Sequence, residues 1–267
     1  MHRATLGASI TALLAAAVVA VPAGAQTENC PAAPTTIQAG PNGGNVNGTP
    51  QNDRIQGSNA DDTVSALQGE DCILGAGGFD TVQGAAGADT IFGQDGPDDL
   101  SGGSQNDRIF GGDDFDFLDG GIGDDDLFGQ GGPDDISGAN GSDEIDGGEG
   151  LDFISGGLGT DDIDGGEDRD DIEGGDGADR IDGGDGNDRI AGGLDGDRLT
   201  GGDGNDRIDG GDGRNRYFGG AGRDVIDAAN GSRETVSCGS GRDVVRADAT
   251  DRLRGCERVF ELRLIDK

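Results

Sequence analysis

From Gly48 to Asp227 the chain consists of one nine-residue unit repeated twenty times without insertion or deletion. A clear copy is Gly183 to Ala191, which reads Gly-Gly-Asp-Gly-Asn-Asp-Arg-Ile-Ala. The first position is Gly, the sixth is Asp and the eighth is aliphatic in nineteen copies each; the exceptions are Ala66, Asn215 and Tyr217. A fixed period of this kind predicts a repeat architecture in which every copy adopts the same local structure.

Each unit divides into a turn and a strand. Gly recurs at the first, second and fourth positions, and it permits the positive φ angles of a tight turn. The last three residues alternate polar, aliphatic, and polar or small, as in a short half-buried strand whose eighth residue alone points inward. Two units then form one flattened coil of 18 residues. We therefore predict an all-β fold, a right-handed parallel β-roll (a two-sheet solenoid) of about ten coils, roughly 48 Å long, with short capping segments.

Such a roll has a thin apolar core. One aliphatic side chain in nine residues cannot offset the entropy lost on ordering so many glycines. The chain is 31% hydrophobic and 4% aromatic, and its net charge is −35. This composition is typical of a chain that stays disordered without help, so another source of folding free energy is required.

The sixth-position aspartates can supply this folding free energy by binding metal ions. We expect them to project from the turns and to stack one coil apart, with Asp188 between Asp170 and Asp206. Carboxylate and carbonyl oxygens from two turns would form a cage for a hard cation such as Ca²⁺. The candidate ligands are Asp71, Asp80, Asp89, Asp98, Asp107, Asp116, Asp125, Asp134, Asp143, Asp152, Asp161, Asp170, Asp179, Asp188, Asp197, Asp206 and Asp224.

The number of possible sites can be bounded by the repeat count. Ten turns on each edge leave nine gaps on each edge, so at most eighteen ions could bind between turns. Eighteen divalent ions would balance the net charge of −36 that the chain carries without its leader. The alternative is a solvated acidic face or simple turn formation by Asp, which would leave like charges stacked along both edges. The case for a site is less complete where the fourth-position Gly is replaced, at Gln51, Ala60, Gln105, Asp114, Asp168 and Asp195, and where Asn215 replaces the Asp.

The repeat matches the pattern G-G-x-G-x-D-x-(aliphatic)-x and resembles the RTX family, also called haemolysin-type calcium-binding repeats. Seven copies carry all four signature residues; they begin at Gly120, Gly147, Gly156, Gly174, Gly183, Gly201 and Gly219. The resemblance implies multiple Ca²⁺ ions held between stacked Gly-Asp turns. The tail from Thr235 resembles the closing segment of secreted actinobacterial calcium-binding repeat proteins.

The flanking segments suggest export. Residues 1–25 read as a Sec-type signal peptide, with an apolar run too short for a membrane span and a cleavage site after Ala25. We expect residues 26–47 to form an N-terminal cap, 48–227 the repeats and 228–267 a C-terminal cap. Four cysteines allow three pairings, and proximity favours Cys30–Cys72 and Cys238–Cys256, each stapling one end of the rod. These features predict a secreted, extracellular protein.

Several functions are disfavoured by the sequence. The negative charge repels nucleic acid. The flanking segments are too small for a catalytic domain, and the one histidine, His2, lies in the signal peptide, so we expect no enzyme activity.

Two hypotheses remain: a soluble calcium-binding or structural protein, or an adhesion module that contacts an unidentified protein or cell surface. Phe92, Phe110 and Phe128 all occupy the ninth position and are spaced by 18 residues. We predict that they stack on the outward face, where they either stabilise the sheet or mark a contact site.

Overall fold

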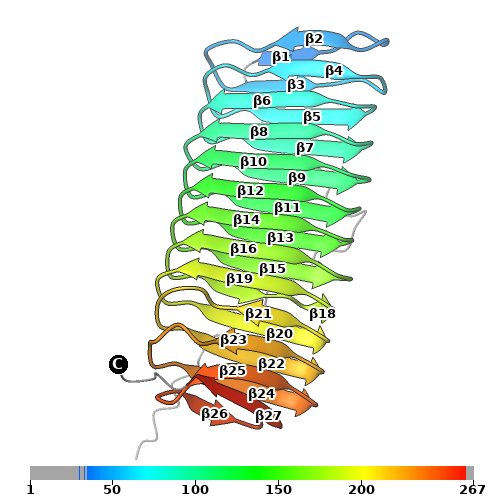
Figure 1. Ribbon diagram of the computed structural model, residues 1–267. Helices are drawn as coiled ribbons and strands as arrows, with labels where there is room; N and C mark the ends of the chain where they lie inside the picture. Colours follow the sequence, from blue (N-terminus) through cyan, green and yellow to red (C-terminus); the bar gives the residue numbers. More distant parts are fainter. Residues whose placement is uncertain (1–29, 31–32, 34, 263–267) are drawn as a thin grey trace, which may run out of the picture.

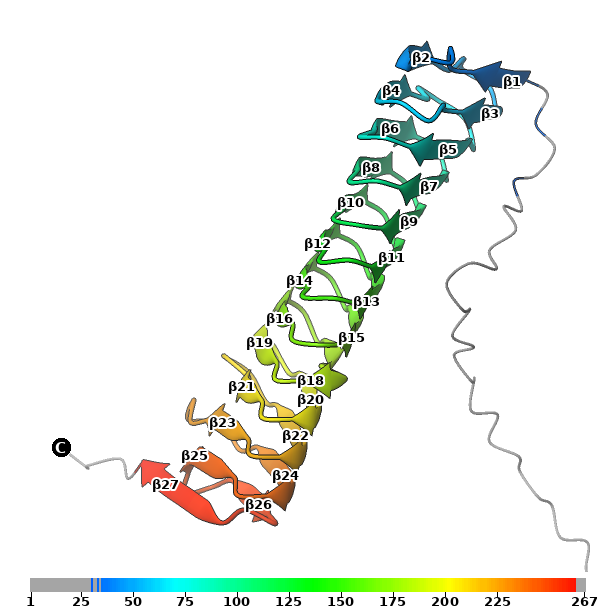
Figure 2. The ribbon, with the colours of Figure 1, turned by 90° about the vertical axis from the view of Figure 1, so that its right-hand side faces the viewer.

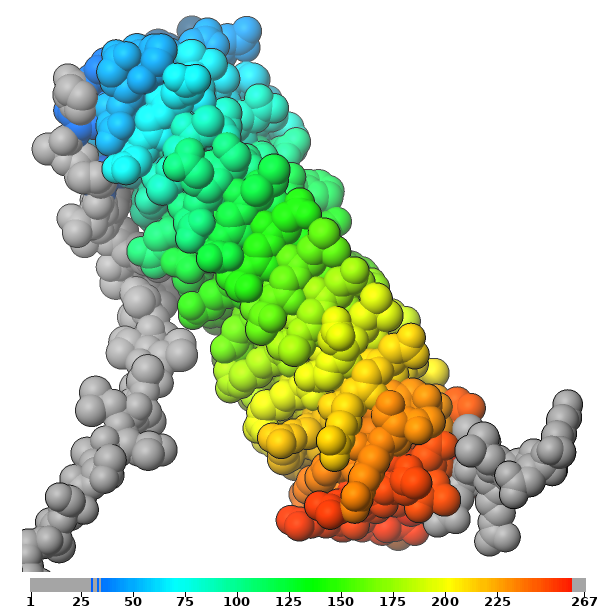
Figure 3. All heavy atoms as spheres, turned by 90° about the vertical axis from the view of Figure 1, so that its left-hand side faces the viewer, coloured from blue at the N-terminus to red at the C-terminus, as the bar shows by residue number. Residues whose placement is uncertain are grey.

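A computed structural model describes residues 30, 33 and 35–262 of the protein. These residues form a rod of stacked coils in which successive strands alternate between two sheets (Figure 1). Figure 2 shows the two sheets as two columns joined by turns, and Figure 3 shows the coils as bands along the surface of the rod. No helix occurs in the described part, so none there could span a membrane. The predicted all-β, two-sheet parallel solenoid is confirmed.

Two sheets of thirteen and fourteen parallel strands make up the rod. Sheet 1 contains β1 (Thr35–Gln38), β3 (Asp53–Gln56), β5 (Cys72–Gly77), β7 (Thr90–Asp95), β9 (Arg108–Asp113), β11 (Asp126–Gly131), β13 (Glu144–Glu149), β15 (Asp162–Glu167), β17 (Arg180–Asp182), β18 (Asp185–Gly186), β20 (Arg198–Gly204), β22 (Arg216–Gly222), β24 (Thr235–Gly241) and β26 (Arg252–Arg254). Sheet 2 contains β2 (Gly44–Asn47), β4 (Asp62–Ser65), β6 (Thr81–Ala86), β8 (Asp99–Ser104), β10 (Phe117–Ile122), β12 (Asp135–Asn140), β14 (Phe153–Leu158), β16 (Asp171–Asp176), β19 (Arg189–Leu194), β21 (Arg207–Asp209), β23 (Val225–Ala228), β25 (Val244–Asp248) and β27 (Arg258–Leu262).

Turns of two kinds connect the sheets. Those that lead from sheet 1 to sheet 2, such as residues 78–80, form one long edge of the rod, called edge 1 below. Those that lead from sheet 2 to sheet 1, such as residues 87–89, form the opposite edge, called edge 2. Equivalent turns on one edge are 18 residues apart, because the strands pair in that register, as Ile145 with Ile163.

Most strands in the regular repeats have six residues rather than the three that the sequence suggested. In β13 the burial alternates from exposed Glu144 through buried Ile145 and half-buried Asp146 to buried Gly147. The strand continues through the first-position glycine because this residue has no side chain to place in the crowded interior. A Cβ atom on Gly147 would lie 2.5 Å from the carbonyl oxygen of Gly165 in the next coil.

The apolar core consists of the eighth-position side chains, two from each coil, stacked along the length of the rod. Residues from Ile55 to Ile226 in this series are at most 3% exposed, and isoleucine predominates. A β-branched side chain suits a pleated surface and packs on its equivalents above and below. Tyr217 occupies the same file and is also buried.

The solenoid has about thirteen coils, and the prediction of about ten was too low. Coils continue beyond both ends of the repeats, with β1 and β2 before them and β24 to β27 after them. At the N-terminal end Ile37 and Val46 supply the inward side chains of the extra coil. Their turns lack the Gly-Asp consensus, which is why the repeat count missed them.

Both predicted disulfides are present. Cys30 pairs with Cys72 of β5, with their Cα atoms 5.7 Å apart, and Cys238 of β24 pairs with Cys256, with 5.2 Å between Cα atoms. The bridges lie at opposite ends of the rod, where open strand edges need protection.

The outward face of sheet 1 carries the predicted phenylalanine stack. The ring centroids of Phe92 and Phe110 lie 4.9 Å apart, and those of Phe110 and Phe128 lie 4.8 Å apart, with the planes nearly parallel. Phe110 is only 6% exposed, so these rings pack mainly on one another and on the sheet. This geometry supports the reading of the stack as an element that stabilises sheet 1.

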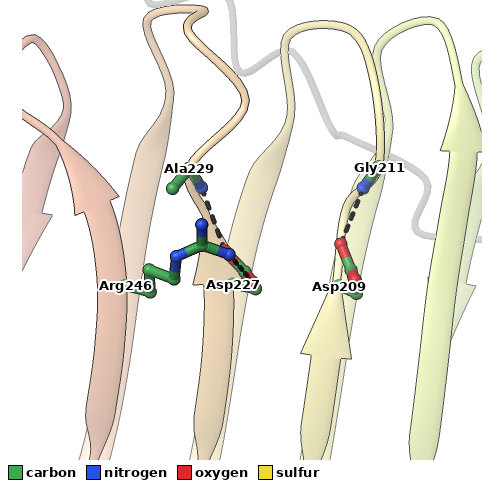
Figure 4. A network of polar contacts seen from close by, with 5 residues as sticks. All are labelled: Asp209, Gly211, Asp227, Ala229 and Arg246. Carbon is green, nitrogen blue, oxygen red and sulfur yellow. Dashed lines mark hydrogen bonds and ion pairs between the residues drawn. The ribbon is translucent and has the colours of Figure 1, made fainter. Parts of the chain in front are cut away.

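Polar side chains also connect neighbouring coils on the outward face of sheet 2. Near its C-terminal end, Arg246 donates a hydrogen bond of 2.8 Å to Asp227 one coil before it (Figure 4). The same carboxylate accepts from the backbone N–H of Ala229, and Asp209 accepts from that of Gly211. Such exposed contacts contribute little to stability individually.

Candidate metal sites

The sixth-position aspartates line the inside of the turns. All nineteen are at most 3% exposed, although the sequence suggested that they project from the turns and that only the eighth residue of each repeat points inward. That expectation was wrong because the chain reverses tightly over the fourth to sixth positions, which turns the carboxylate back toward the first-position glycine.

One carboxylate oxygen of each candidate ligand connects its turn to the preceding coil. The backbone N–H of Asp170 donates to Oδ1 of Asp188 at 3.0 Å, and the N–H of Asp188 donates to Oδ1 of Asp206 at 3.0 Å. All seventeen candidates accept such a bond, at distances of 2.7 to 3.1 Å. The predicted stacking of these residues at intervals of 18 is therefore present on both edges.

The other oxygen is buried without a hydrogen bond. In all seventeen candidates Oδ2 has no hydrogen-bond partner among the described residues. It lies beside the first-position glycine of its own repeat: a Cβ atom on Gly129 would be 2.5 Å from Oδ2 of Asp134 and 2.5 Å from the carbonyl oxygen of Gly147. A carboxylate oxygen and a carbonyl oxygen thus converge on the space that glycine leaves open.

Burial changes the acid–base behaviour of these carboxyl groups. It is the main cause that raises the pKa of Asp98 to about 8, and those of Asp116 and Asp134 to about 7, from an ordinary 3.8. Hydrogen bonds from the preceding coil oppose the shift, and neighbouring carboxylates add to it. A buried carboxylate with a raised pKa needs either a proton or a cation.

The repeats match a known family along their whole length. The sequence profile of the RTX calcium-binding nonapeptide repeat (four copies) matches seven overlapping segments: 47–82, 74–109, 101–136, 128–163, 137–172, 164–199 and 192–226. Together they cover well over half of the chain. It belongs to the RTX family. No curated protein matches the chain. RTX repeats are typically secreted and structural rather than catalytic, they imply Ca²⁺ binding, and the two disulfides fit an extracellular location.

The donor set of the RTX turns fits a calcium ion. The described residues contain no group of three or more acidic, His or Cys side chains close enough to hold a metal by themselves. The oxygens available in each turn are instead one buried carboxylate oxygen and backbone carbonyls. Ca²⁺ accepts a mixture of carboxylate, carbonyl and water oxygens in a flexible geometry.

Several altered RTX turns keep a positive φ angle at the fourth position. Gln105, Asp114, Asp168 and Asp195 replace the fourth-position glycine, yet they adopt positive φ angles of 69° to 82°. A residue with a side chain loses about 1 kcal/mol or more in this region. The repeated stack therefore imposes the turn on residues that do not favour it.

One RTX turn has lost the carboxylate. Asn215 still accepts the backbone N–H of Asp197 at 2.8 Å, but its amide donates to the carbonyl of Gly210 at 2.9 Å. Its amide nitrogen also lies 3.4 Å from the hydroxyl oxygen of Tyr217. The side-chain atoms of Asn215 are thus held by hydrogen bonds, and this repeat contributes no carboxylate oxygen of its own to the turn.

The carboxylate ladders extend beyond the seventeen candidates. Asp53 and Asp62, at the N-terminal end, are buried. Oδ2 of each accepts a hydrogen bond from a turn hydroxyl, that of Thr49 for Asp53 and that of Ser58 for Asp62. After residue 224 the ladders continue through Glu234 and Asp243, both buried and each with one oxygen lacking a hydrogen bond.

The sequence analysis missed these two residues because one inserted residue changes the spacing from 18 to 19. The N–H of Asp224 donates to Oδ1 of Asp243 at 3.1 Å, which places Asp243 at a sixth position. The Gly239-x-Gly241-x-Asp243 motif was the available signal.

Proposed function

We propose that this RTX chain is a secreted, non-catalytic protein that folds on binding multiple Ca²⁺ ions in the turns of the roll. The seventeen candidate aspartates act as ligands. The observation that carries the proposal is common to all of them: Oδ1 is held by the neighbouring coil, while Oδ2 is buried without a hydrogen bond. An ionised oxygen in that state costs several kcal/mol, and a bound cation removes the cost.

The two carboxylate oxygens of each aspartate have different roles. Oδ1 accepts the backbone N–H of the preceding coil and so fixes the rotation of the carboxylate. Oδ2 then faces the ion, together with carbonyl oxygens such as that of Gly147 beside Asp134. The ion supplies positive charge that neutralises the carboxylates and draws adjacent turns together. The roll supplies the spacing, because its coils are about 4.8 Å apart.

Calcium can provide the folding free energy that the core lacks. Extracellular sites bind with Kd of about 10⁻⁴ to 10⁻³ M. At ~1 mM Ca²⁺ and a Kd of ~0.1 mM, each site contributes roughly 1.4 kcal/mol, and ten sites contribute on the order of 14 kcal/mol. Stabilities of folded domains are about 5 to 15 kcal/mol, so this contribution decides whether the chain folds.

Secretion is supported by the disulfides and by the family. The proposed signal peptide, residues 1–25, and its cleavage site after Ala25 lie outside the described residues. Both disulfides require an oxidising compartment, and millimolar calcium is available outside cells.

The absence of catalysis is proposed from the placement of the carboxylates. An acid–base pair works in a cleft that admits a substrate. The sixth-position carboxylates are instead enclosed in the turns, at most 3% exposed.

A second candidate function is adhesion through outward residues of the roll. It is favoured by one observation: the large apolar side chains that remain exposed in the repeats lie on sheet 2 and on the turns next to it, including Phe79, Ile122 and Phe153. This role is compatible with calcium-driven folding, since calcium would build the surface.

The calcium proposal is tested by substituting each of two neighbouring aspartates in turn. Asp134 is buried in a turn, whereas Asp135 is exposed on sheet 2. Asp134→Asn should lower the free energy of unfolding in saturating Ca²⁺ by about 1–3 kcal/mol and reduce the number of bound ions. Asp135→Asn is the matched control and should change neither quantity. Equal effects of the two substitutions in a calcium titration and a thermal melt would contradict the proposal.

A further inference from the structure

An exposed apolar ridge runs along edge 1. It is formed by the fifth-position residues of five successive turns, joined by two seventh-position rings of sheet 2. Its members are Phe79, Pro97, Phe115, Pro133, Leu151, Phe117 and Phe153. Because each step is one coil of about 4.8 Å, the five turns extend the ridge over roughly 19 Å.

The rings of this apolar ridge face solvent. Phe79 is 49% exposed and Phe153 is 57% exposed. Phe115 and Phe117 contact each other edge to face, with centroids 4.7 Å apart, and both remain more than a third exposed. Beside Phe117 the surface has a shallow depression lined by Asp99 and Asp135.

Packing of the roll does not require these rings. The fifth positions of the corresponding turns on edge 2 are polar or small: Glu70, Ala88, Asn106, Asp124 and Ser142. The stack of Phe92, Phe110 and Phe128 lies on sheet 1 and is largely buried, so it is a separate feature. A row of exposed aromatic and apolar side chains that fills the fifth positions of one edge, and not those of the other, is typical of a contact surface.

The surroundings of the apolar ridge are acidic. Asp95, Asp113 and Asp114 flank it on the side of sheet 1, and Asp99 and Asp135 flank it on sheet 2. Between Arg54 and Arg169 the chain has one basic residue, Arg108, which is ion-paired with Asp126 on sheet 1. Calcium in the turns would neutralise inward carboxylates but would leave this outward rim charged.

We infer that the apolar ridge is a docking surface for a segment of another protein in which basic and large apolar side chains are combined. Apolar side chains would cover the rings, and lysine or arginine would meet the acidic rim. The inference goes beyond calcium binding, because it concerns outward residues and requires only the folded roll. A second copy of the chain fits less well, because ridge against ridge would bring two acidic rims together.

The test uses a labelled peptide of alternating leucine and lysine as the probe, with calcium-loaded protein at physiological salt. The ridge variant is Phe79→Ser, Phe115→Ser and Leu151→Ser combined. Its matched control is Ile122→Ser, Leu158→Ser and Leu194→Ser combined, three residues of similar exposure elsewhere on sheet 2. We expect the ridge variant to weaken binding about tenfold and the control less than about twofold, by fluorescence anisotropy.

Two further measurements keep the result interpretable. Circular dichroism and calcium stoichiometry should be the same in both variants, because the substituted side chains are exposed. If the variants instead fail to fold, Asp99→Asn with Asp135→Asn serves as a second ridge variant and should weaken binding about threefold.

Three outcomes would overturn the inference. The first is equal weakening by the ridge and control variants. The second is equally tight binding of a serine–lysine peptide, which would reduce the interaction to charge. The third is a calcium-dependent dimer that sedimentation detects in the wild type and not in the ridge variant. This result would assign the ridge to a second copy of the chain. Such a copy has a basic half, with fourteen arginines from Arg169 to Arg258.

Discussion

The side-chain amide of Asn215 donates a hydrogen bond of 2.9 Å to the carbonyl oxygen of Gly210 inside a turn of the roll. In the seventeen repeats with a candidate aspartate, an aspartate oxygen without a hydrogen bond occupies the corresponding place. Tyr217, two residues further on, brings a buried hydroxyl within 3.4 Å of the same amide. The two departures from the repeat thus occur together, and hydrogen bonds replace the interaction that we assign to calcium elsewhere.

Restoring the consensus in this repeat should create a calcium site. Asn215→Asp combined with Tyr217→Ile is expected to raise the number of bound ions by one, measured by calorimetric titration. In chelator the same variant should show no more β structure than the wild type, because it adds a buried charge. Asn205→Asp, at an exposed fifth position, is the control and should add no ion. An unchanged ion count in the double variant would contradict the assignment of the turn interior as the site.

The first-position glycines of the central repeats, such as Gly147, are expected not to tolerate a side chain. A Cβ atom on Gly147 would lie 2.5 Å from the carbonyl of Gly165 and 2.6 Å from Oδ2 of Asp152. Gly147→Ala should therefore lower the free energy of unfolding in calcium by about 1–3 kcal/mol, measured by denaturant titration. At Gly131 the nearest atom is 3.8 Å away, so Gly131→Ala should be close to neutral. If both substitutions were neutral, the oxygens would not converge as described.

The phenylalanine stack on sheet 1 should affect stability and not association. Replacing Phe92, Phe110 and Phe128 with Ser removes three rings in face-to-face contact. We expect a loss of about 3 kcal/mol or more in calcium, with unchanged sedimentation. Loss of a dimer, or of attachment to a cell-surface fraction, would instead assign the stack to a contact site.

The stability of the metal-free roll should fall as the pH rises. Burial raises the folded-state pKa of Asp98 to about 8, and those of Asp116 and Asp134 to about 7, above the ordinary 3.8 of an unfolded chain. The folded chain therefore binds more protons between pH 4 and 8, and its stability is greatest at the acidic end of that range. Without calcium, circular dichroism should show more β structure near pH 4 than near pH 8.

Calcium should reverse this trend, because ions compete with protons for the same carboxylates. Binding near pH 6.5 should release protons, which titrations in buffers of different ionisation enthalpy detect. Asp98→Asn with Asp116→Asn should reduce the number of protons released. A metal-free roll that gained stability between pH 4 and pH 7 would contradict the burial of these groups.

The nine-residue period predicted the sheets, their register and the neighbouring aspartates, because it identifies equivalent residues. It did not predict that the carboxylates turn inward, since the direction of a turn side chain depends on backbone angles. The left-handed φ of Asp195 at a position that favours glycine shows how strongly the stack imposes those angles.

The limits of the roll were missed for a different reason. Ile37 and Val46 continue the nine-residue spacing of the eighth position upstream of Ile55, but their turns lack the Gly-Asp consensus. The apolar series, rather than the turn motif, therefore marks where the solenoid begins. The apolar ridge emerges only when every second repeat is compared, as in Phe79, Pro97 and Phe115, because one coil contains two repeats.

Titration of the chain that begins at residue 26 with Ca²⁺, followed by circular dichroism and hydrodynamic radius, tests the central claim most directly. In chelator we expect an expanded chain with little β signal, because the core alone cannot order the glycine-rich backbone. Calcium at ~1 mM should produce a compact β-rich rod that binds roughly ten or more ions. A chelated protein that keeps its full β signal and its compact radius would contradict calcium-driven folding.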